Sequence, residues 1–247
     1  MTKKIILVTG ASSGIGRNAA ASLCTKGFTV IGTARSKQGL EETNALCNGH
    51  MDTIVCDVTD PKAVDALFEN IKSRHGRLDV VFNNAGNALP ATNFGDLELD
   101  QFNKVMDVNI TGAFLIANRA YRMMRDQTPQ GGRIINNGSI SAYMPRPGSA
   151  PYSISKHAIS GMTRTIALDG RAHNIACGQI DIGNAATDMT AQFSEGVAQA
   201  DGSLKREPTM DLQNVGDAVV HMAGLPLDAN ILFMTIMATG MPYVGRG

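Results

Sequence analysis

Short apolar runs alternate with longer amphipathic segments along almost the whole chain. The apolar runs fall near residues 4–9, 28–33, 53–57, 78–83, 132–138, 174–181 and 231–237. Helical spacing of apolar residues appears near 14–26, 37–47, 61–75, 98–126, 151–170 and 212–224. Continuous apolar runs are typical of strands buried on both faces, and their alternation with helices is typical of a parallel sheet. The pattern predicts an α/β fold with a doubly wound parallel sheet of about seven strands, flanked by helices on both faces.

Composition favours one globular domain without a nucleic-acid or membrane partner. The 247 residues are 43% hydrophobic and show no internal repeat or linker, so we expect a single domain over residues 1–247. Lys plus Arg and Asp plus Glu both number 22, which gives no basic surface for nucleic acid or acidic membranes. The first apolar run begins at once after the N-terminus, so we expect no signal peptide, and the run at 231–238 is too short to span a bilayer.

Cysteines and histidines give no sign of a disulfide framework or a metal site. The four cysteines lack a C-x-x-C motif, which favours reduced thiols and a cytoplasmic location. The five histidines have no i,i+4 pair and no acidic partner at metal-ligand spacing. We therefore predict a cytoplasmic protein without a metal.

A glycine-rich turn follows the first predicted strand. Gly10, Gly14 and Gly16 precede a helical segment, and Gly27 is placed to end that helix. A strand that turns into a helix N-terminus presents backbone N–H groups and a positive dipole end to an anion. Glycines let the backbone turn tightly and approach a pyrophosphate closely. Such a turn alone is also compatible with an ordinary loop, and its strand–turn–helix setting favours dinucleotide binding.

Tyr152 and Lys156 are one helical turn apart and therefore share one face of a predicted helix. An ammonium group beside a phenol favours the phenolate form, which makes the phenol a better acid–base group near neutral pH. Ser139, thirteen residues before Tyr152, is placed to hold a substrate oxygen, with Ser141 as the alternative. An isolated Tyr-x-x-x-Lys pair is more often ordinary helix surface, but together with the glycine turn it favours catalysis on a carbonyl/alcohol pair.

These motifs, in this order, resemble the short-chain dehydrogenase/reductase family in its shorter-chain, Tyr-x-x-x-Lys branch. The spacing Gly10-x3-Gly14-x-Gly16 is that family's and differs from the G-x-G-x-x-G of other dinucleotide folds. The order continues through Asp57, Asn84-Ala85-Gly86, Asn109, Ser139, Tyr152, Lys156, Ile182-Gly183 and Thr187. The resemblance covers nearly the whole chain. It implies a Rossmann-type fold, a substrate lid near 184–210, a small-molecule carbonyl or alcohol substrate and a homodimer or homotetramer.

The resemblance also implies the roles of the catalytic residues. Tyr152 would exchange a proton with the substrate oxygen, and Ser139 would hold that oxygen. Lys156 would bond the nicotinamide ribose hydroxyls, and Asn109 would hold a water that links Lys156 to solvent. The alternative for Asn109 is a side chain that bonds a neighbouring carbonyl and distorts its helix locally.

The same resemblance implies a set of cofactor contacts. These are Gly10, Ser12, Ser13, Gly14, Ile15, Gly16, Arg35, Asp57, Val58, Asn84, Ala85, Gly86, Tyr152, Lys156, Ile182, Gly183 and Thr187. Asp57 would accept a hydrogen bond from the adenine amino group, and its alternative role is that of a turn aspartate. Thr187 would bond the nicotinamide carboxamide. Ile182 stands where the family usually has proline, which alters the expected nicotinamide pocket.

The end of the second predicted strand favours NADP(H) over NAD(H). Sites that prefer NAD place an acidic residue there to hold the ribose 2′-hydroxyl, and this chain has Ala34 instead. Arg35 follows and can pair with a 2′-phosphate through its planar fork, with Lys37 beside it. The alternative is that both cations are the solvated start of a helix, and Ser13 lacks the base that many NADP-preferring relatives carry.

The leading hypothesis is an NADP(H)-dependent oxidoreductase that interconverts a ketone or aldehyde and an alcohol. The alternatives are a cofactor-binding regulatory protein with little turnover and a structural subunit, which would leave the glycine turn unexplained. Pro90, Phe94, Met144 and Pro145 indicate an apolar wall beside the substrate, which favours a mainly apolar substrate.

Overall fold

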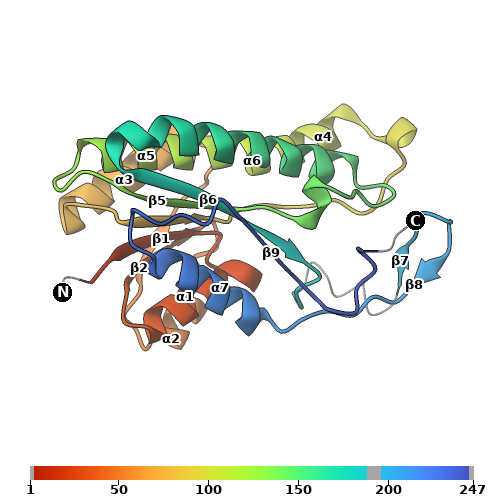
Figure 1. The fold of residues 1–247 in the computed structure, drawn as a ribbon, viewed down its shortest axis with the longest axis horizontal. Coiled ribbons are helices and arrows are strands. Elements are labelled where there is room, and N and C mark those ends of the chain that lie inside the picture. The colour runs from red at the N-terminus through yellow and green to blue at the C-terminus, as the bar shows by residue number, and fades with distance from the viewer. Residues whose placement is uncertain (1–2, 188–195, 245–247) are drawn as a thin grey trace.

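A seven-stranded parallel sheet forms the centre of the molecule, as Figure 1 shows. The computed structural model describes residues 3–187 and 196–244. The strands are β1 (Ile5–Thr9), β2 (Thr29–Ala34), β3 (Asp52–Val55), β4 (Val80–Asn83), β5 (Gly132–Asn137), β6 (Ile175–Gly183) and β9 (Phe233–Met237). Their order across the sheet is β3-β2-β1-β4-β5-β6-β9, and every neighbouring pair is parallel. The predicted α/β doubly wound fold is therefore confirmed.

Helices cover both faces of the sheet (Figure 1). One face carries α1 (Gly14–Thr25), α2 (Lys37–Leu46) and α7 (Leu212–Gly224). The other carries α3 (Pro61–His75), α4 (Leu99–Met106), α5 (Ala113–Asp126) and α6 (Ala150–Asp169). Local signals fix the helix ends: the Asp60 carboxylate accepts a hydrogen bond from the Lys62 amide as N-cap of α3, and Gly76 ends that helix with φ +72°.

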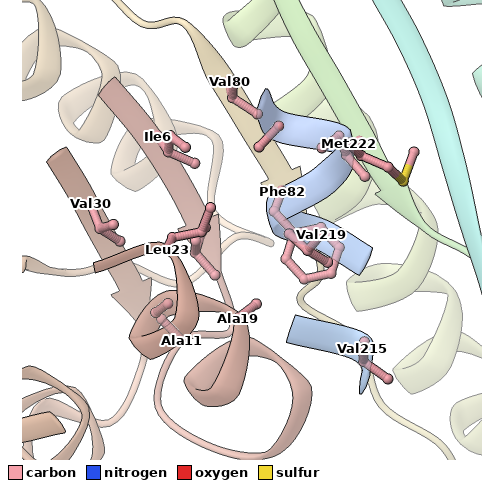
Figure 2. Close-up of a cluster of buried hydrophobic side chains, with 14 of the residues drawn as sticks. Ile6, Ala11, Ala19, Leu23, Val30, Val80, Phe82, Val215, Val219 and Met222 are labelled. Carbon is pink, nitrogen blue, oxygen red and sulfur yellow. The ribbon is translucent and has the colours of Figure 1, made fainter. Parts of the chain in front are cut away.

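Two hydrophobic clusters hold these layers together, because successive residues of a strand point to opposite faces of the sheet. Ile6 and Val8 pack with α1 and α7 in the first cluster, where Leu23 and Val219 meet them (Figure 2). Leu7 points the other way, into a cluster with α3 and α5. These clusters fix the sheet, and so bring the carboxyl ends of its strands to one edge.

The strand order reverses between β1 and β4, so the chain leaves these two strands toward opposite faces of the sheet. A crevice is left between the two connections, beside the strand ends. Ligands of open α/β sheets bind in the crevice at such a point, outside the carboxyl ends of the strands. The glycine turn follows β1 and Asn84 follows β4, so the fold brings these two predicted cofactor segments to the same crevice.

One helix differs from its prediction. The amphipathic segment at 98–126 is divided into α4 and α5 by a π-helical turn, Asp107–Gly112. Asn109 lies in that turn, and its side chain bonds backbone groups of another segment, which apolar periodicity does not reveal. The remaining short helices are the 3-10 turns Phe94–Asp96, Ile140–Ala142 and Gly170–His173.

Part of the predicted lid, residues 188–195 of 184–210, lies outside the described residues. Its later part holds two short antiparallel strands, β7 (Val197–Ala198) and β8 (Leu204–Lys205), apart from the main sheet. No helix of the described residues combines the length and the apolar character needed to cross a membrane.

Candidate functional site

A groove of about 410 Å³ lies at the carboxyl edge of the sheet. It is lined by all the predicted cofactor contacts except Gly183, namely Gly10, Ser12, Ser13, Gly14, Ile15, Gly16, Arg35, Asp57, Val58, Asn84, Ala85, Gly86, Tyr152, Lys156, Ile182 and Thr187. Positions that were not among the predicted cofactor contacts also line it, among them Asn87, Asn137, Gly138 and Asn184. Residues spread over most of the chain thus face one space.

The glycine turn requires its glycines. Gly10 and Gly14 have φ values of +66° and +50°, a region that residues with a side chain rarely adopt. A Cβ on Gly16 would lie 2.2 Å from the Gly10 carbonyl oxygen, so the helix can pack this closely against the turn only without one. The backbone of the turn is thereby exposed to the groove at close range.

The N-terminus of α1 is left open toward the groove. Among the described residues no side chain caps this helix, although Ser13 occupies the N-cap position in extended conformation. Its first N–H groups and the positive end of its dipole therefore suit an anion such as a pyrophosphate. Arg17 and Thr43 support the turn from behind by donating to the carbonyl oxygens of Ser12 and Ala11. These residues fit a dinucleotide cofactor.

Arg35 and Asp57 line the groove near the ends of β2 and β3. Ala34 is buried and leaves no carboxylate at the end of β2, while Arg35 is exposed and lines the groove. The Thr59 amide hydrogen bond, followed by smaller contributions that include the Arg35 charge, lowers the pKa of Asp57 despite partial burial. Asp57 thus has the turn role that was its alternative, and it also lines the groove. Lys37 instead lies 3.8 Å from Glu41 on the exposed face of α2.

The segment Asn84-Ala85-Gly86 is fastened to β1. The Thr9 hydroxyl oxygen accepts hydrogen bonds from the amides of Asn84 and Ala85, at 2.8 and 2.9 Å. The Asn84 side chain donates to the Thr9 carbonyl and accepts from the Asn137 side chain, both at 2.8 Å. Three strand ends, those of β1, β4 and β5, are held in fixed positions as a result.

Tyr152 and Lys156 share the face of α6 that borders the groove. The Lys156 ammonium lies 5.4 Å from the centre of the Tyr152 ring and donates to the Asn137 carbonyl oxygen at 2.7 Å. Lys156 is only 6% exposed, so its ammonium group is largely shielded from solvent. The predicted pair is therefore brought together beside the cofactor groove.

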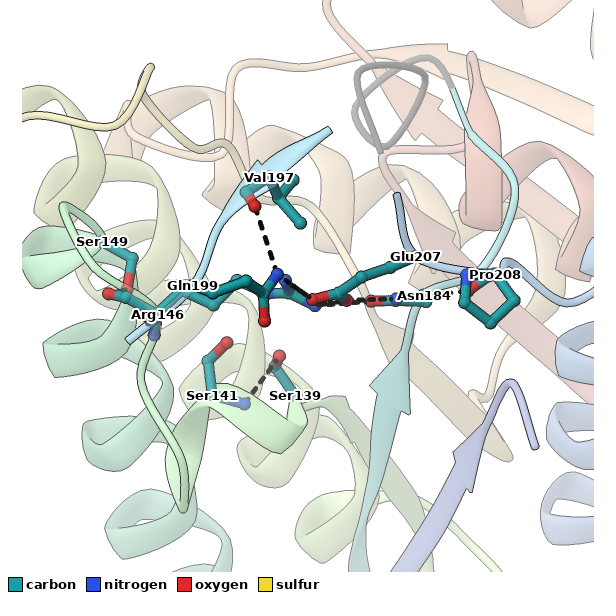
Figure 3. A network of polar contacts seen from close by, with 9 residues as sticks. All are labelled: Ser139, Ser141, Arg146, Ser149, Asn184, Val197, Gln199, Glu207 and Pro208. Atoms are coloured by element: carbon teal, nitrogen blue, oxygen red, sulfur yellow. Dashed lines mark hydrogen bonds and ion pairs between the residues drawn. The ribbon is translucent and has the colours of Figure 1, made fainter. Parts of the chain in front are cut away.

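Ser139 follows β5 and is the N-cap of the short turn Ile140–Ala142. Its hydroxyl oxygen accepts from the Ser141 amide at 3.1 Å, which leaves the hydroxyl proton available to another oxygen (Figure 3). Ser141, the alternative, is likewise buried, and it contributes its backbone amide to Ser139. This arrangement favours Ser139 as the group that donates to a substrate.

Asn109 sits in the π-helical turn, where it is 3% exposed. Its side chain accepts from the Asn87 amide at 2.8 Å and donates to the Asn87 carbonyl at 2.9 Å and to the Ser155 hydroxyl at 3.1 Å. The helix is locally distorted, as the alternative role of Asn109 predicted. The hydrogen-bond partners of its side chain, however, lie on the segment of Asn87 and on α6. Asn109 therefore ties the loop after β4 to the helix of Tyr152 and Lys156.

Ile182 and Gly183 end β6. Ile182 pairs in register with Ile236 of β9, so replacement of the family's proline leaves the strand continuous to its end. A Cβ on Gly183 would lie 2.9 Å from the Met237 side chain and 3.0 Å from the Ile140 side chain. Gly183 is packed against these side chains and does not line the groove. Thr187 lines the groove opposite Gly14.

A buried ion pair connects the loop before α6 to the segment after β6 (Figure 3). Arg146 donates to both carboxylate oxygens of Glu207 at 2.8 and 2.6 Å and to the Asn184 side chain at 2.9 Å. Burial raises the pKa of Glu207, but hydrogen bonds from Arg146, Gln199 and Asn184 together outweigh it and lower the pKa to about 2. No sequence motif indicates this pair, whose members are 61 residues apart.

Within the described residues no three histidine, cysteine or acidic side chains are grouped to hold a metal ion.

Known proteins with this sequence pattern and fold are numerous. A family model described as short chain dehydrogenase matches residues 4–198. The 3beta-hydroxysteroid dehydrogenase of Mediterraneibacter gnavus is 35% identical over 78% of this chain and 70% of its own length. The 3-oxoacyl-(acyl-carrier-protein) reductase FabG of Salmonella typhimurium is 32% identical over 89% of each chain. A short-chain type dehydrogenase/reductase from Mycobacterium marinum superposes with a TM-score of 0.83 at 26% identity, covering 94% of this chain and 93% of the other.

Proposed function

The chain belongs to the short-chain dehydrogenase/reductase family of oxidoreductases, and from that premise we propose that it is an NADP(H)-dependent enzyme that interconverts a carbonyl and an alcohol. The observation that carries the proposal is the shared groove. Tyr152 and Lys156 line the same space as the glycine turn, so an acid–base group and a dinucleotide cradle face each other. A regulatory protein that only bound cofactor would have no chemical need for that pair.

The proposed reaction divides its work among four side chains. When bound, the nicotinamide cofactor supplies the hydride for the carbonyl carbon. Tyr152 gives its proton to the substrate oxygen, and Ser139, whose oxygen is already engaged by the Ser141 amide, directs its own proton at the same oxygen. Lys156 stabilises the phenolate that remains and holds the nicotinamide ribose. Asn109 completes the relay with a water that returns a proton through Lys156.

The preference for NADP(H) rests on the end of β2. Ala34 places no carboxylate against a 2′-phosphate, and Arg35 is an exposed cation on the groove wall. Asp57 lines the groove as well, and we propose that its carboxylate meets the adenine amino group. Replacing Arg35 with alanine tests the preference directly.

The substrate is proposed to be a ketone or aldehyde on a mainly apolar skeleton. Phe94 and Met144 are exposed apolar side chains on the loops predicted to form the pocket wall, at 75% and 52% exposure. Two relatives are named as a 3beta-hydroxysteroid dehydrogenase and a 3-oxoacyl-(acyl-carrier-protein) reductase, names that specify a hydroxyl and a carbonyl group. We further propose that residues 184–210 form the lid over this pocket and that the protein is a cytoplasmic homodimer or homotetramer.

The decisive experiment is NADPH oxidation against a panel of ketones, aldehydes and 3-oxoacyl thioesters, repeated with NADH. Tyr152→Phe should abolish turnover and retain NADPH binding measured by fluorescence titration. Tyr121→Phe is the matched control, because that hydroxyl donates to the Asp169 carbonyl on the outer helices and has no part in the groove. Full activity of Tyr152→Phe would contradict the proposal. Tight NADPH binding without turnover across the panel would favour the regulatory alternative.

A further inference from the structure

Asp181 is a fully buried carboxylate directly behind the catalytic serine. One carboxylate oxygen, Oδ1, accepts hydrogen bonds from the Ser139 amide at 3.0 Å and from the Gln179 side chain at 2.6 Å. The other, Oδ2, accepts from the Tyr143 hydroxyl at 2.9 Å. Removing a carboxylate from water is costly unless hydrogen bonds compensate for it, so these three donors act together to keep it in place.

Gln179 extends these contacts to the catalytic helix. Its amide nitrogen donates to the Ser160 hydroxyl at 3.0 Å, and its amide oxygen accepts from the Thr163 hydroxyl at 3.0 Å. Ser160 and Thr163 belong to α6, the helix that carries Tyr152 and Lys156. A continuous set of hydrogen bonds therefore runs from the Ser139 backbone through Asp181 and Gln179 to α6.

Gly138 shows how tightly the carboxylate fits. A Cβ on Gly138 would lie 2.1 Å from Asp181 Oδ1 and 2.5 Å from the Gln179 amide nitrogen, so these two side chains occupy the place of the missing one. Gly138 also lines the cofactor groove on its other side. The backbone between Asn137 and Ser139 is thus confined between the groove and the carboxylate.

Tyr143 connects the carboxylate to the loop before α6. Burial and then the hydrogen bond to Asp181 raise the pKa of Tyr143 to about 12, so its hydroxyl stays protonated and remains a donor. The side chain is nevertheless 41% exposed, on a loop that leads from Ser139 toward Tyr152. Asp181 therefore also fixes a side chain at the edge of the expected substrate pocket.

We propose that Asp181 is a positioning residue that holds Ser139 in a fixed place relative to α6, the helix that carries Tyr152. Ser139 and Tyr152 must reach the same substrate oxygen, and they come from different elements. Asp181 and Gln179 join those elements by hydrogen bonds. The proposal rests on the proposed function, because it assigns Ser139 its role in holding the substrate oxygen.

The test compares Asp181→Ala with Asp181→Asn. Alanine leaves the Ser139 amide and the Gln179 side chain without their acceptor, so we expect kcat to fall about 100-fold, the effect of a misplacement of about 1 Å. Asparagine keeps Oδ1 for both donors, and its amide group can donate to Tyr143, whose hydroxyl turns to accept. Asp181→Asn should therefore recover most of kcat, and both variants should bind NADPH like the wild type.

Asp79→Ala is the matched control for a purely structural effect. Asp79 also accepts from a backbone amide, that of Ile5 at 2.8 Å, but it lies at the opposite end of the sheet. We expect Asp79→Ala to lower the melting temperature and leave kcat unchanged. Asp181→Ala with kcat within about threefold of the wild type, measured below its melting temperature, would overturn the proposal.

Amide hydrogen exchange of the segment 138–143 provides a readout independent of activity. Asp181→Ala should accelerate exchange at Ser139, and Asp181→Asn should restore its protection, because only the alanine variant lacks an acceptor for that amide. Unchanged exchange in Asp181→Ala would overturn the proposal. A wild-type protein without turnover on any substrate would contradict the proposed function instead, and exchange would still decide whether Asp181 positions Ser139.

Discussion

Glu207→Gln is expected to weaken the fold strongly, and in a pH-dependent way. The Glu207 side chain has no exposed surface. From the described residues its carboxylate accepts four hydrogen bonds, two from Arg146, one from Asn184 and one from Gln199. Glutamine removes the charge and presents an amide N–H₂ to a guanidinium that has no acceptor to offer. Arg146 is only 16% exposed at its side chain, so water replaces the lost partner poorly.

The structure gives the size of this effect. The carboxyl pKa falls from 4.5 to about 2 on folding, which corresponds to about 3 kcal/mol at neutral pH. Breaking a buried ion pair by removing one partner costs about 3–5 kcal/mol, which agrees. Because the folded-state pKa is the lower one, the stabilisation is complete above about pH 4.5 and is lost as the pH falls toward 2.

The assay is urea unfolding of the wild type and Glu207→Gln, at several pH values between 7 and 3. Far-UV circular dichroism is the suitable probe, since the chain has no tryptophan. The difference in unfolding free energy should be about 3 kcal/mol at pH 7 and 5 and should shrink steadily below pH 4.5. Glu41→Gln is the control, because the ion pair of Glu41 with Lys37 is exposed and contributes little at any pH.

Two outcomes would refute the reasoning. A difference below about 1 kcal/mol at pH 7 would mean that the pair behaves as a surface ion pair. A large difference that stays constant down to pH 3 would mean that glutamine disturbs packing and that the charge of Glu207 is not the cause.

Three further predictions concern the groove and the residues that support it. Gly16→Ala should weaken NADPH binding at least tenfold by isothermal titration, because its Cβ would meet the Gly10 carbonyl oxygen, and normal affinity would contradict the need for a close turn. Arg35→Ala should raise the Kd for NADPH about tenfold or more and leave that for NADH nearly unchanged, whereas an equal change for both would remove the assigned role. Asn109→Ala leaves both backbone groups of Asn87 unpaired and should lower the unfolding free energy by about 2–4 kcal/mol, measured by urea unfolding; a smaller loss would show that water replaces the side chain.

Local sequence signals predicted most elements to within a few residues. Asp60, Pro61 and Gly76 mark the ends of α3, and the helix predicted at 61–75 is the one observed. The segment at 98–126 shows the limit of such signals. Its apolar periodicity continues through Asn109 and gives no sign of the π-helical turn. In that turn the Asn109 side chain bonds the backbone of Asn87, which comes from a distant loop.

The candidate site likewise contains residues that sequence motifs indicated and residues that they did not. Motifs such as the glycine turn and Tyr152 with Lys156 are local, so their spacing alone indicated chemistry, and the groove brings them together. Asp181 gave no such signal. An acidic residue in a buried strand is recognisable as a partner of Ser139 only once β5 and β6 are paired.

The sequence by itself determined the order of strands and helices along the chain, because short-range periodicity encodes it. Its motifs indicated the family and the candidate residues for the chemistry, because their spacing is local. Only the tertiary structure decided which side chains hold those residues in position. Asp181 meets Ser139, and Arg146 meets Glu207, across 42 and 61 residues of chain. Such partners are set by strand pairing and burial, which act over the whole fold and leave no mark on the local pattern of the chain.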